Sequence, residues 1–366
     1  MWNDLILQDR RRLTRLMKTW RHPWFLGLLG AAIVPLAVIA VMSWGAMPTQ
    51  QPATMRIGYF PNMTHAQALV GRANGRFEQV IGKAAGVEWK AFNAGPQAIE
   101  ALFVNAIDIA YVGPNPTVAG YSRSRGAALR VIAGATSGGA ALVVRTAAGI
   151  GQPSDFHGKR VATPQLGGTQ DVALRGWLAA HNMRPREKGG DVLIFPTANP
   201  NQLTLFLSGQ LDAAWAPEPW ASILVHQGGG RIFLDERDLW PNREFITTNV
   251  IVSTRFLKEH PDLVKLFLRA HVELTGWLLQ NPAQAKQILN SQIQKETGRA
   301  MPASVLEDGF ARMKPTYDPL RSSLMKSTEE AFAEGFLGRT KPDLEGLYDL
   351  GPLNEVLRES KARPVQ

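Results

Sequence analysis

Short apolar runs alternate with longer stretches of helical period between Met55 and Ser253. This alternation is typical of parallel β-strands that are covered by helices. It predicts ten strands, at 55–59, 87–91, 107–112, 131–135, 140–144, 160–163, 192–195, 213–216, 231–234 and 248–253. Ten strands are enough for two sheets, so the pattern indicates an α/β protein with more than one layer of strands.

The pattern changes after Ser253, where only helical periodicity remains. Helices are expected at 254–281, 282–296, 302–313 and 320–336, with no further strand. This order, with the strands first and only helices at the end, suggests that a second lobe is inserted into the first. We therefore expect lobe 1 at 55–141 and 249–366 and lobe 2 at 142–248. The crossings are expected near 139–145 and 244–250, with a ligand cleft between the lobes. No internal repeat is evident.

The first 54 residues differ from the rest in composition. Residues 24–42 contain no charged side chain, and nineteen residues at a rise of 1.5 Å nearly match a hydrocarbon core about 30 Å thick. Residues 1–23 hold six basic side chains, which predicts a cytoplasmic N-terminal region and export of the main body. Residues 43–54 are expected to be a linker. Segment 24–42 is either a transmembrane anchor or a cleaved signal peptide.

Composition and charge exclude several classes of protein. With no cysteine, the chain can form no disulfide, thiolate metal site or lipid-modified cysteine. The net charge is +9, but much of the excess lies before residue 47, and the rest of the chain has no basic stripe with interleaved aromatic residues. We therefore expect no nucleic-acid partner. Sequence motifs of nucleotide-binding proteins, metalloproteases and serine hydrolases are absent as well, which argues against an enzyme.

Five loops that follow predicted strands combine Gly or Pro with small polar side chains. In open α/β sheets ligands bind beyond the carboxyl ends of strands, on the loops that lead into helices. The loop 165–171 opens a helix, whose free N–H groups and dipole attract an anion. The prolines of loop 112–116 stiffen a turn, which suits either preorganised binding or an ordinary turn. The glycines of loop 136–139 allow either a close approach of the backbone or a hinge. The loop at 60–65 could bind a ligand or cap a helix. The loop at 215–220 could bind a ligand or pack its tryptophans into the core.

Six segments together resemble one known family. They are 55–60 (MRIGYF), 94–102 (AGPQAIEAL), 107–111 (IDIAY), 167–169 (GGT), 211–215 (LDAAW) and 218–220 (EPW). In order and spacing they resemble the periplasmic substrate-binding proteins of ABC transporters for aliphatic sulfonates, taurine and nitrate. The resemblance extends over about residues 55–357.

The resemblance implies a two-lobed periplasmic-binding-protein fold of type II that closes on a small anion and delivers it to a permease and its ATPase. An aliphatic sulfonate is favoured, and taurine, nitrate and a phosphonate stay open. No catalytic residue, metal or cofactor is implied, and a monomer in the periplasm is expected, either anchored through 24–42 or released. The implied ligand-binding residues are Asn62, Thr64, His65, Gly113, Pro114, Asn115, Ser137, Gly138, Gly168, Thr169, Gln170, Trp215 and Glu218.

Two other functions stay open. Related folds support enzymes of pyrimidine or menaquinone-precursor metabolism, and an anchored domain of this kind could report its ligand to a membrane partner as a sensor. Export argues against the first of these alternatives.

Overall fold

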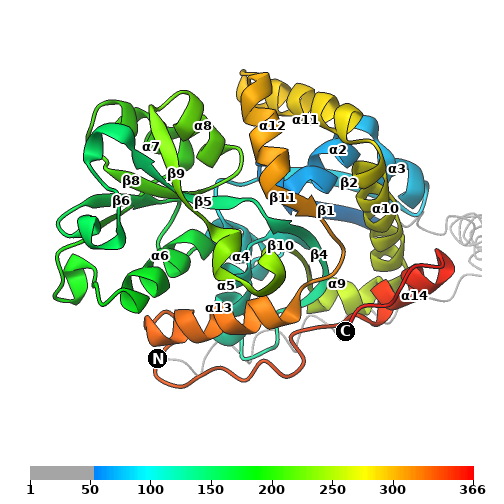
Figure 1. The fold of residues 1–366 in the computed structure, drawn as a ribbon. Coiled ribbons are helices and arrows are strands. Elements are labelled where there is room, and N and C mark those ends of the chain that lie inside the picture. Colours follow the sequence, from blue (N-terminus) through cyan, green and yellow to red (C-terminus); the bar gives the residue numbers. More distant parts are fainter. Residues whose placement is uncertain (1–52) are drawn as a thin grey trace, which may run out of the picture. The chain divides into compact units, whose positions relative to one another are not determined.

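The computed structural model describes residues 53–366, which form two mixed β-sheets (Figure 1). Sheet A has the strand order β11-β4-β10-β3-β1-β2, and sheet B has the order β7-β6-β8-β5-β9. The strands of sheet A are β1 Ala53–Tyr59, β2 Ala85–Ala91, β3 Ile109–Val112, β4 Leu129–Gly138, β10 Ile246–Ser253 and β11 Met313–Pro315. The strands of sheet B are β5 Ala140–Arg145, β6 Arg160–Thr163, β7 Leu193–Pro196, β8 Ala213–Pro217 and β9 Gly230–Asp235.

Helices cover both sheets. We call sheet A with its helices lobe 1, and sheet B with its helices, drawn in green in Figure 1, lobe 2. Lobe 2 contains α6 Thr169–Ala180, α7 Asn199–Leu207 and α8 Trp220–His226. The helices of lobe 1 are α2 Ala66–Asn74, α3 Arg76–Ile81, α4 Gly95–Phe103, α5 Pro114–Arg123, α9 Thr254–Glu259, α10 Pro261–Gln280, α11 Pro282–Thr297, α12 Ala303–Arg312, α13 Arg321–Ala333 and α14 Gly351–Glu359.

All ten predicted strands are confirmed, with ends that differ by at most three residues. The prediction that no strand follows Ser253 is wrong. β11 has only three residues, Met-Lys-Pro, and pairs antiparallel with the edge of β4, so it shows no alternation that a sequence pattern could detect. The predicted helix 254–281 is divided at His260, because Pro261 cannot continue the preceding helix.

The chain passes from sheet A to sheet B at two glycines. Gly138 and Gly139 have φ values of 72° and 82°, in the left-handed region that residues with a Cβ rarely adopt. The Gly138 N–H donates to the Phe245 carbonyl (3.0 Å), and the Gly139 N–H donates to the Arg312 carbonyl (2.8 Å). Three segments of the chain therefore meet where the two sheets join.

The two lobes share an arginine–aspartate clasp. In lobe 1, Arg56 on β1 donates to both carboxylate oxygens of Asp108, through Nε (2.8 Å) and Nη2 (2.7 Å). In lobe 2, Arg160 on β6 donates to both oxygens of Asp212, at 2.9 and 2.8 Å. The sequence separation is 52 residues in both cases. The sequence showed no internal repeat, yet both lobes attach the first parallel strand to the start of the third in the same way.

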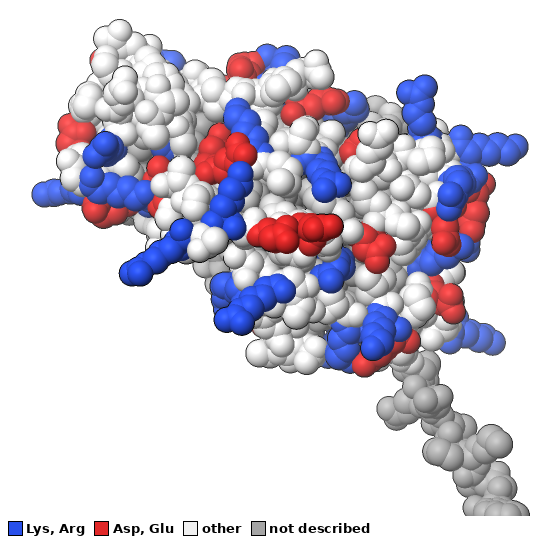
Figure 2. Space-filling model, turned by 90° about the horizontal axis from the view of Figure 1, so that it is seen from below, with Lys and Arg blue, Asp and Glu red and all other residues white. Residues whose placement is uncertain are grey.

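The segment predicted to enter the membrane, 24–42, lies outside the described residues, as do 1–23 and most of the linker 43–54. Within residues 53–366 no helix is both long and apolar enough to cross a bilayer. The same residues hold no cluster of three or more side chains that could bind a metal ion. On the face shown in Figure 2, basic and acidic side chains are interspersed.

Candidate functional site

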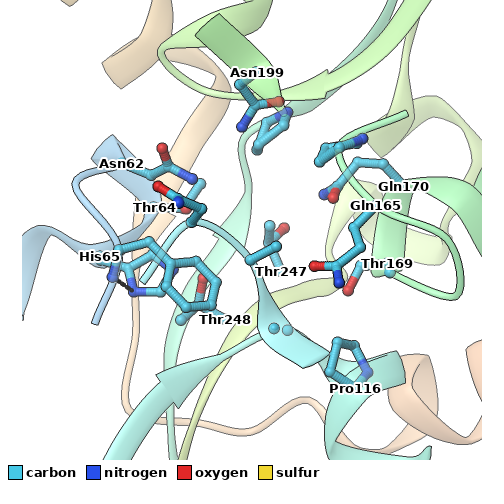
Figure 3. A pocket seen from close by; sticks show the side chains of 18 of the residues that line it. Asn62, Thr64, His65, Pro116, Gln165, Thr169, Gln170, Asn199, Thr247 and Thr248 are labelled. Carbon is cyan, nitrogen blue, oxygen red and sulfur yellow. Dashed lines mark hydrogen bonds between the residues drawn. The ribbon is translucent and has the colours of Figure 1, made fainter. Parts of the chain in front are cut away.

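A small cavity lies at the carboxyl ends of the parallel strands of both sheets. Its volume is about 50 Å³, enough for about three to five water-sized groups. Lobe 1 contributes residues that follow β1, β2 and β3, and lobe 2 contributes residues that follow β6 and β7. Figure 3 shows Asn62, Thr64 and His65 on one side and Gln165, Thr169 and Gln170 on the other. We call this space the anion cavity.

Four helices begin at the wall of the anion cavity. They are α4 at Gly95, α5 at Gly113 and Pro114, α6 at Thr169 and α7 at Asn199. The first N–H groups of a helix have no partner inside the helix, and each N-terminus carries the equivalent of about half a positive charge. Two of these helices belong to each lobe, so the positive ends of both lobes meet around one small space.

The side chains around the cavity carry no counter-charge. Among the lining residues within 53–366 there is no Asp, Glu, Lys or Arg. Two lining side chains also have unused hydrogen-bonding capacity, because Gln165 Oε1 and Asn199 Oδ1 are buried without a partner in the described part of the chain. Rotation of either carboxamide would turn its NH₂ group toward an anion.

His65 is the one titratable group among these lining residues. Burial lowers the pKa of His65 to about 3, so the imidazole is neutral at physiological pH. The Phe60 N–H donates to His65 Nδ1 (3.2 Å), which leaves the ring proton on Nε2. His65 therefore offers one neutral N–H donor and no positive charge.

Seven of the thirteen predicted ligand-binding residues line the anion cavity, namely Asn62, Thr64, His65, Gly113, Gly168, Thr169 and Gln170. The other six do not line it. Pro114 and Asn115 lie in the first turn of α5, and the Asn115 side chain is bonded to Ser327 of α13. Ser137 and Gly138 end β4 at the crossing between the sheets.

Trp215 belongs to the core of lobe 2. Its side chain is fully buried, and its indole Nε1 donates to Glu236 Oε2 (2.7 Å). Burial raises the pKa of Glu236 to about 8 despite this bond. Of the two interpretations open for Trp215, the structure shows core packing.

Glu218 joins the two lobes through an ion pair. Its fully buried carboxylate accepts from Arg312 Nη1 of α12 (3.0 Å) and from the Ser222 N–H of α8 (3.1 Å). Burial raises the pKa of Glu218, and the charge of Arg312 acts in the opposite direction. This carboxylate is therefore paired between the lobes and does not line the anion cavity.

Several lining residues were missed by the sequence analysis. Asn93, Ala94 and Gly95 follow β2, and Asn199 follows β7. Both strands were predicted, so the rule that ligands lie beyond strand ends could have identified these loops. Thr247 and Thr248 lie on β10 at the return crossing, and nothing in the sequence marks them. Phe60, Pro96, Pro116, Pro164, Gln165 and Pro217 complete the wall.

The two lobes touch at the edge of the cavity. A Cβ atom added to Gly113 would lie 2.3 Å from Thr169 Oγ1, too close for any real contact. Trp220 Nε1 of lobe 2 also donates to Asn62 Oδ1 of lobe 1 (3.2 Å). The first contact brings the N-termini of α5 and α6 together, and the second joins α8 to the loop after β1, so the two lobes touch across the cavity.

Known proteins share this fold. The taurine-binding periplasmic protein of Escherichia coli (strain K12) is 25% identical over 253 residues, which are 68% of this chain and 72% of that protein. The alkanesulfonate-binding protein SsuA from Xanthomonas axonopodis pv. citri, solved bound to MOPS, has a TM-score of 0.68 at 23% identity, with 81% of this chain and 99% of that one covered. The nitrate-binding protein NrtA from Synechocystis PCC 6803 also has a TM-score of 0.68, at 17% identity, with 85% and 89% covered.

These likenesses confirm the two-lobed periplasmic-binding-protein fold expected from the sequence. The model of the NMT1-like family matches residues 49–291, about two thirds of the chain. The protein therefore belongs to the NMT1-like family.

Proposed function

We propose that the protein is the extracytoplasmic solute-binding component of an ABC importer and that it captures a small oxyanion. The observation that carries this proposal is the convergence of four helix N-termini on a cavity whose described lining has no ionised side chain. Relatives with names that state taurine, alkanesulfonate and nitrate binding support it. Because these relatives are binding proteins, they favour a receptor over an enzyme.

The energetics are adequate for such a receptor. Micromolar affinity requires about 8 kcal/mol, and a hydrogen bond to a charged group contributes about 1.5–3 kcal/mol. Four or five donors therefore suffice. The wall offers the backbone N–H groups of Thr169 and Gln170 at the start of α6 and of Asn199 at the start of α7. The side chains of Asn62, Thr64, His65 and Thr169 add further donors.

In the proposed mechanism the ligand stabilises the closed state by touching both lobes. Asn62, Thr64, His65 and Gly113 would contact it from lobe 1, and Gly168, Thr169 and Gln170 from lobe 2. The lobes would move about the crossings near 139–145 and 244–250, where the chain leaves sheet A for β5 and returns to it in β10. A sulfonate is the favoured headgroup, because relatives named for taurine and alkanesulfonate binding share the fold. The size of the cavity does not separate it from nitrate or a phosphonate, which also have four heavy atoms in the group to be held.

The proposed partners are a permease and its ATPase, with the protein acting as a monomer that is attached through 24–42 or released after cleavage. Thermal unfolding of the purified protein tests the ligand class. The panel is ethanesulfonate, taurine, nitrate, bicarbonate, methylphosphonate and an aminopyrimidine, each at millimolar concentration.

At 100 times its dissociation constant a ligand adds about 2.7 kcal/mol, which raises the midpoint by several degrees. We expect such a shift with at least one oxyanion and none with the aminopyrimidine. A shift with the aminopyrimidine alone would favour the enzyme scaffold, and no shift with any oxyanion would contradict the proposal.

A further inference from the structure

A second, larger space adjoins the anion cavity. Its volume is about 600 Å³, within the range of about 300–1,000 Å³ that is typical of organic ligand sites. It shares four lining residues with the anion cavity, Phe60, Asn62, Asn93 and Asn199. The two spaces therefore lie next to each other, with these four residues at their boundary. We call the larger space the tail groove.

The tail groove is lined from both lobes, and aromatic and aliphatic side chains dominate its wall. Phe60 and Phe92 come from lobe 1, and Leu203, Trp220 and Ile223 come from lobe 2. The Trp220 indole is held in place by its bond to Asn62 Oδ1, at the boundary between the cavity and the groove. Fixed aromatic side chains bury flat, apolar groups at a low cost in conformational entropy.

Two charged residues also line the tail groove. The Glu296 carboxylate is paired with Arg72 (2.7 Å), and its Oε1 also accepts from Gln292 (2.6 Å). Arg299 is exposed. Arg72 balances the charge of Glu296, whose Oε2 is buried without a partner among the described residues, and Arg299 adds a positive charge. The wall therefore carries no net negative charge that would favour an ammonium group on the ligand.

We propose that the natural ligand is an oxyanion with a bulky apolar tail, of which an arylsulfonate is the type, and that the tail lies between the two lobes in the groove. This inference rests on the proposed function, because it takes the headgroup site as given. The inference names a narrower class of ligand than the proposed function does. Nitrate is outside this class because it has no tail, and taurine is outside it because its ammonium group would lie where the groove offers apolar contact. A tail between the lobes also adds contacts that exist only in the closed state.

A titration series with a constant headgroup tests the proposal. Calorimetry on the full protein would compare methanesulfonate, ethanesulfonate, taurine and benzenesulfonate. Each fully buried methylene is worth about fourfold in affinity. We expect benzenesulfonate to bind at least about tenfold tighter than methanesulfonate and taurine to bind more weakly than ethanesulfonate.

The outcomes separate the two proposals. If neither a sulfonate nor any other oxyanion of the thermal panel binds, the proposed function is overturned. Binding of methanesulfonate with no gain for benzenesulfonate would overturn the tail groove alone. Tighter binding of taurine than of ethanesulfonate would assign the groove to an ammonium group near Glu296 and overturn the aryl tail.

A pair of variants on α7 locates the tail. Thr204 is exposed and lines the groove, whereas Leu207, 61% exposed on the same helix, does not line it. Thr204→Trp fills the groove, so the ratio of benzenesulfonate to methanesulfonate affinity should fall at least about fivefold. Leu207→Trp adds the same bulk outside the groove and should keep the wild-type ratio. Equal ratios in both variants would overturn the assignment of the groove, and thermal unfolding checks that each variant is folded.

Discussion

Lobes 1 and 2 are built on the same plan but use one equivalent loop differently. In each lobe the arginine of the first parallel strand, β1 or β6, clasps an aspartate 52 residues later. A second arginine approaches each aspartate, Arg255 at 3.3 Å and Arg145 at 3.5 Å. Beyond the clasp the lobes diverge. The segment after β3 lines the anion cavity through Gly113 and Pro116, whereas the segment after β8 buries Glu218 against Arg312.

The difference shows that equivalent loops can line the cavity alone or also hold the lobes together, because Pro217 and Trp220 of the lobe 2 segment line the cavity and the groove as well. In lobe 1 the loop supplies a helix N-terminus without side-chain charge, which suits an anion that must be released again. In lobe 2 the equivalent loop supplies a buried charge that attaches α8 to α12. A loop that lines a candidate ligand site can therefore also join the two lobes.

The largest loss of stability is expected when the Glu218–Arg312 ion pair of the lobe 2 loop is broken. Arg312→Met leaves the fully buried Glu218 carboxylate without its cation, which costs about 3–5 kcal/mol of unfolding free energy. Lys314→Met, two residues away, breaks an exposed pair with Glu244 and should cost less than about 1 kcal/mol. Urea denaturation measures both. Equal losses would show that the Arg312–Glu218 pair contributes no more than a surface contact.

Loss of either arginine–aspartate clasp should reduce stability, and the clasp of lobe 2 should contribute less. Asp108→Ala and Asp212→Ala each remove hydrogen bonds between charged groups that are worth about 1.5–3 kcal/mol in total stability. The side chain of Arg160 is 37% exposed and that of Arg56 is 27% exposed, so water compensates Arg160 better and Asp212→Ala should cost less. Denaturation of the two variants checks this order. A larger loss for Asp212→Ala would contradict the order expected from the exposure of the two arginines.

The loop of lobe 1 should affect binding rather than stability. In Gly113→Ala the new methyl group collides with Thr169 Oγ1 in the closed state, so ligand affinity should fall at least about tenfold, equivalent to about 1.4 kcal/mol. The double variant Gly113→Ala, Thr169→Ala removes the collision.

The double variant should bind more tightly than Gly113→Ala alone, and calorimetric titration with a bound oxyanion measures the difference. If Gly113→Ala binds as well as the wild type, the close contact between α5 and α6 is not part of the ligand-bound state.

The sequence predicted the strands well because each has an apolar run bounded by Gly, Pro or polar residues. It predicted part of the cavity wall for a related reason, since loops after parallel strands are where ligands bind. It could not assign Trp215 or Glu218, because their roles depend on Glu236 and Arg312, which are distant from them in the chain. The clasps escaped detection because two residues 52 positions apart leave no local pattern.

The central claim is that an oxyanion is held by helix N-termini and neutral donors, without a cation. Calorimetric titration of the tightest-binding sulfonate between pH 5 and pH 8 at constant ionic strength tests it most directly. Because burial keeps the pKa of His65 at about 3, the imidazole stays neutral over this range, and the dissociation constant should change less than about threefold. A loss of affinity of tenfold or more as the pH rises would show that a protonated histidine supplies the charge, and would contradict the account.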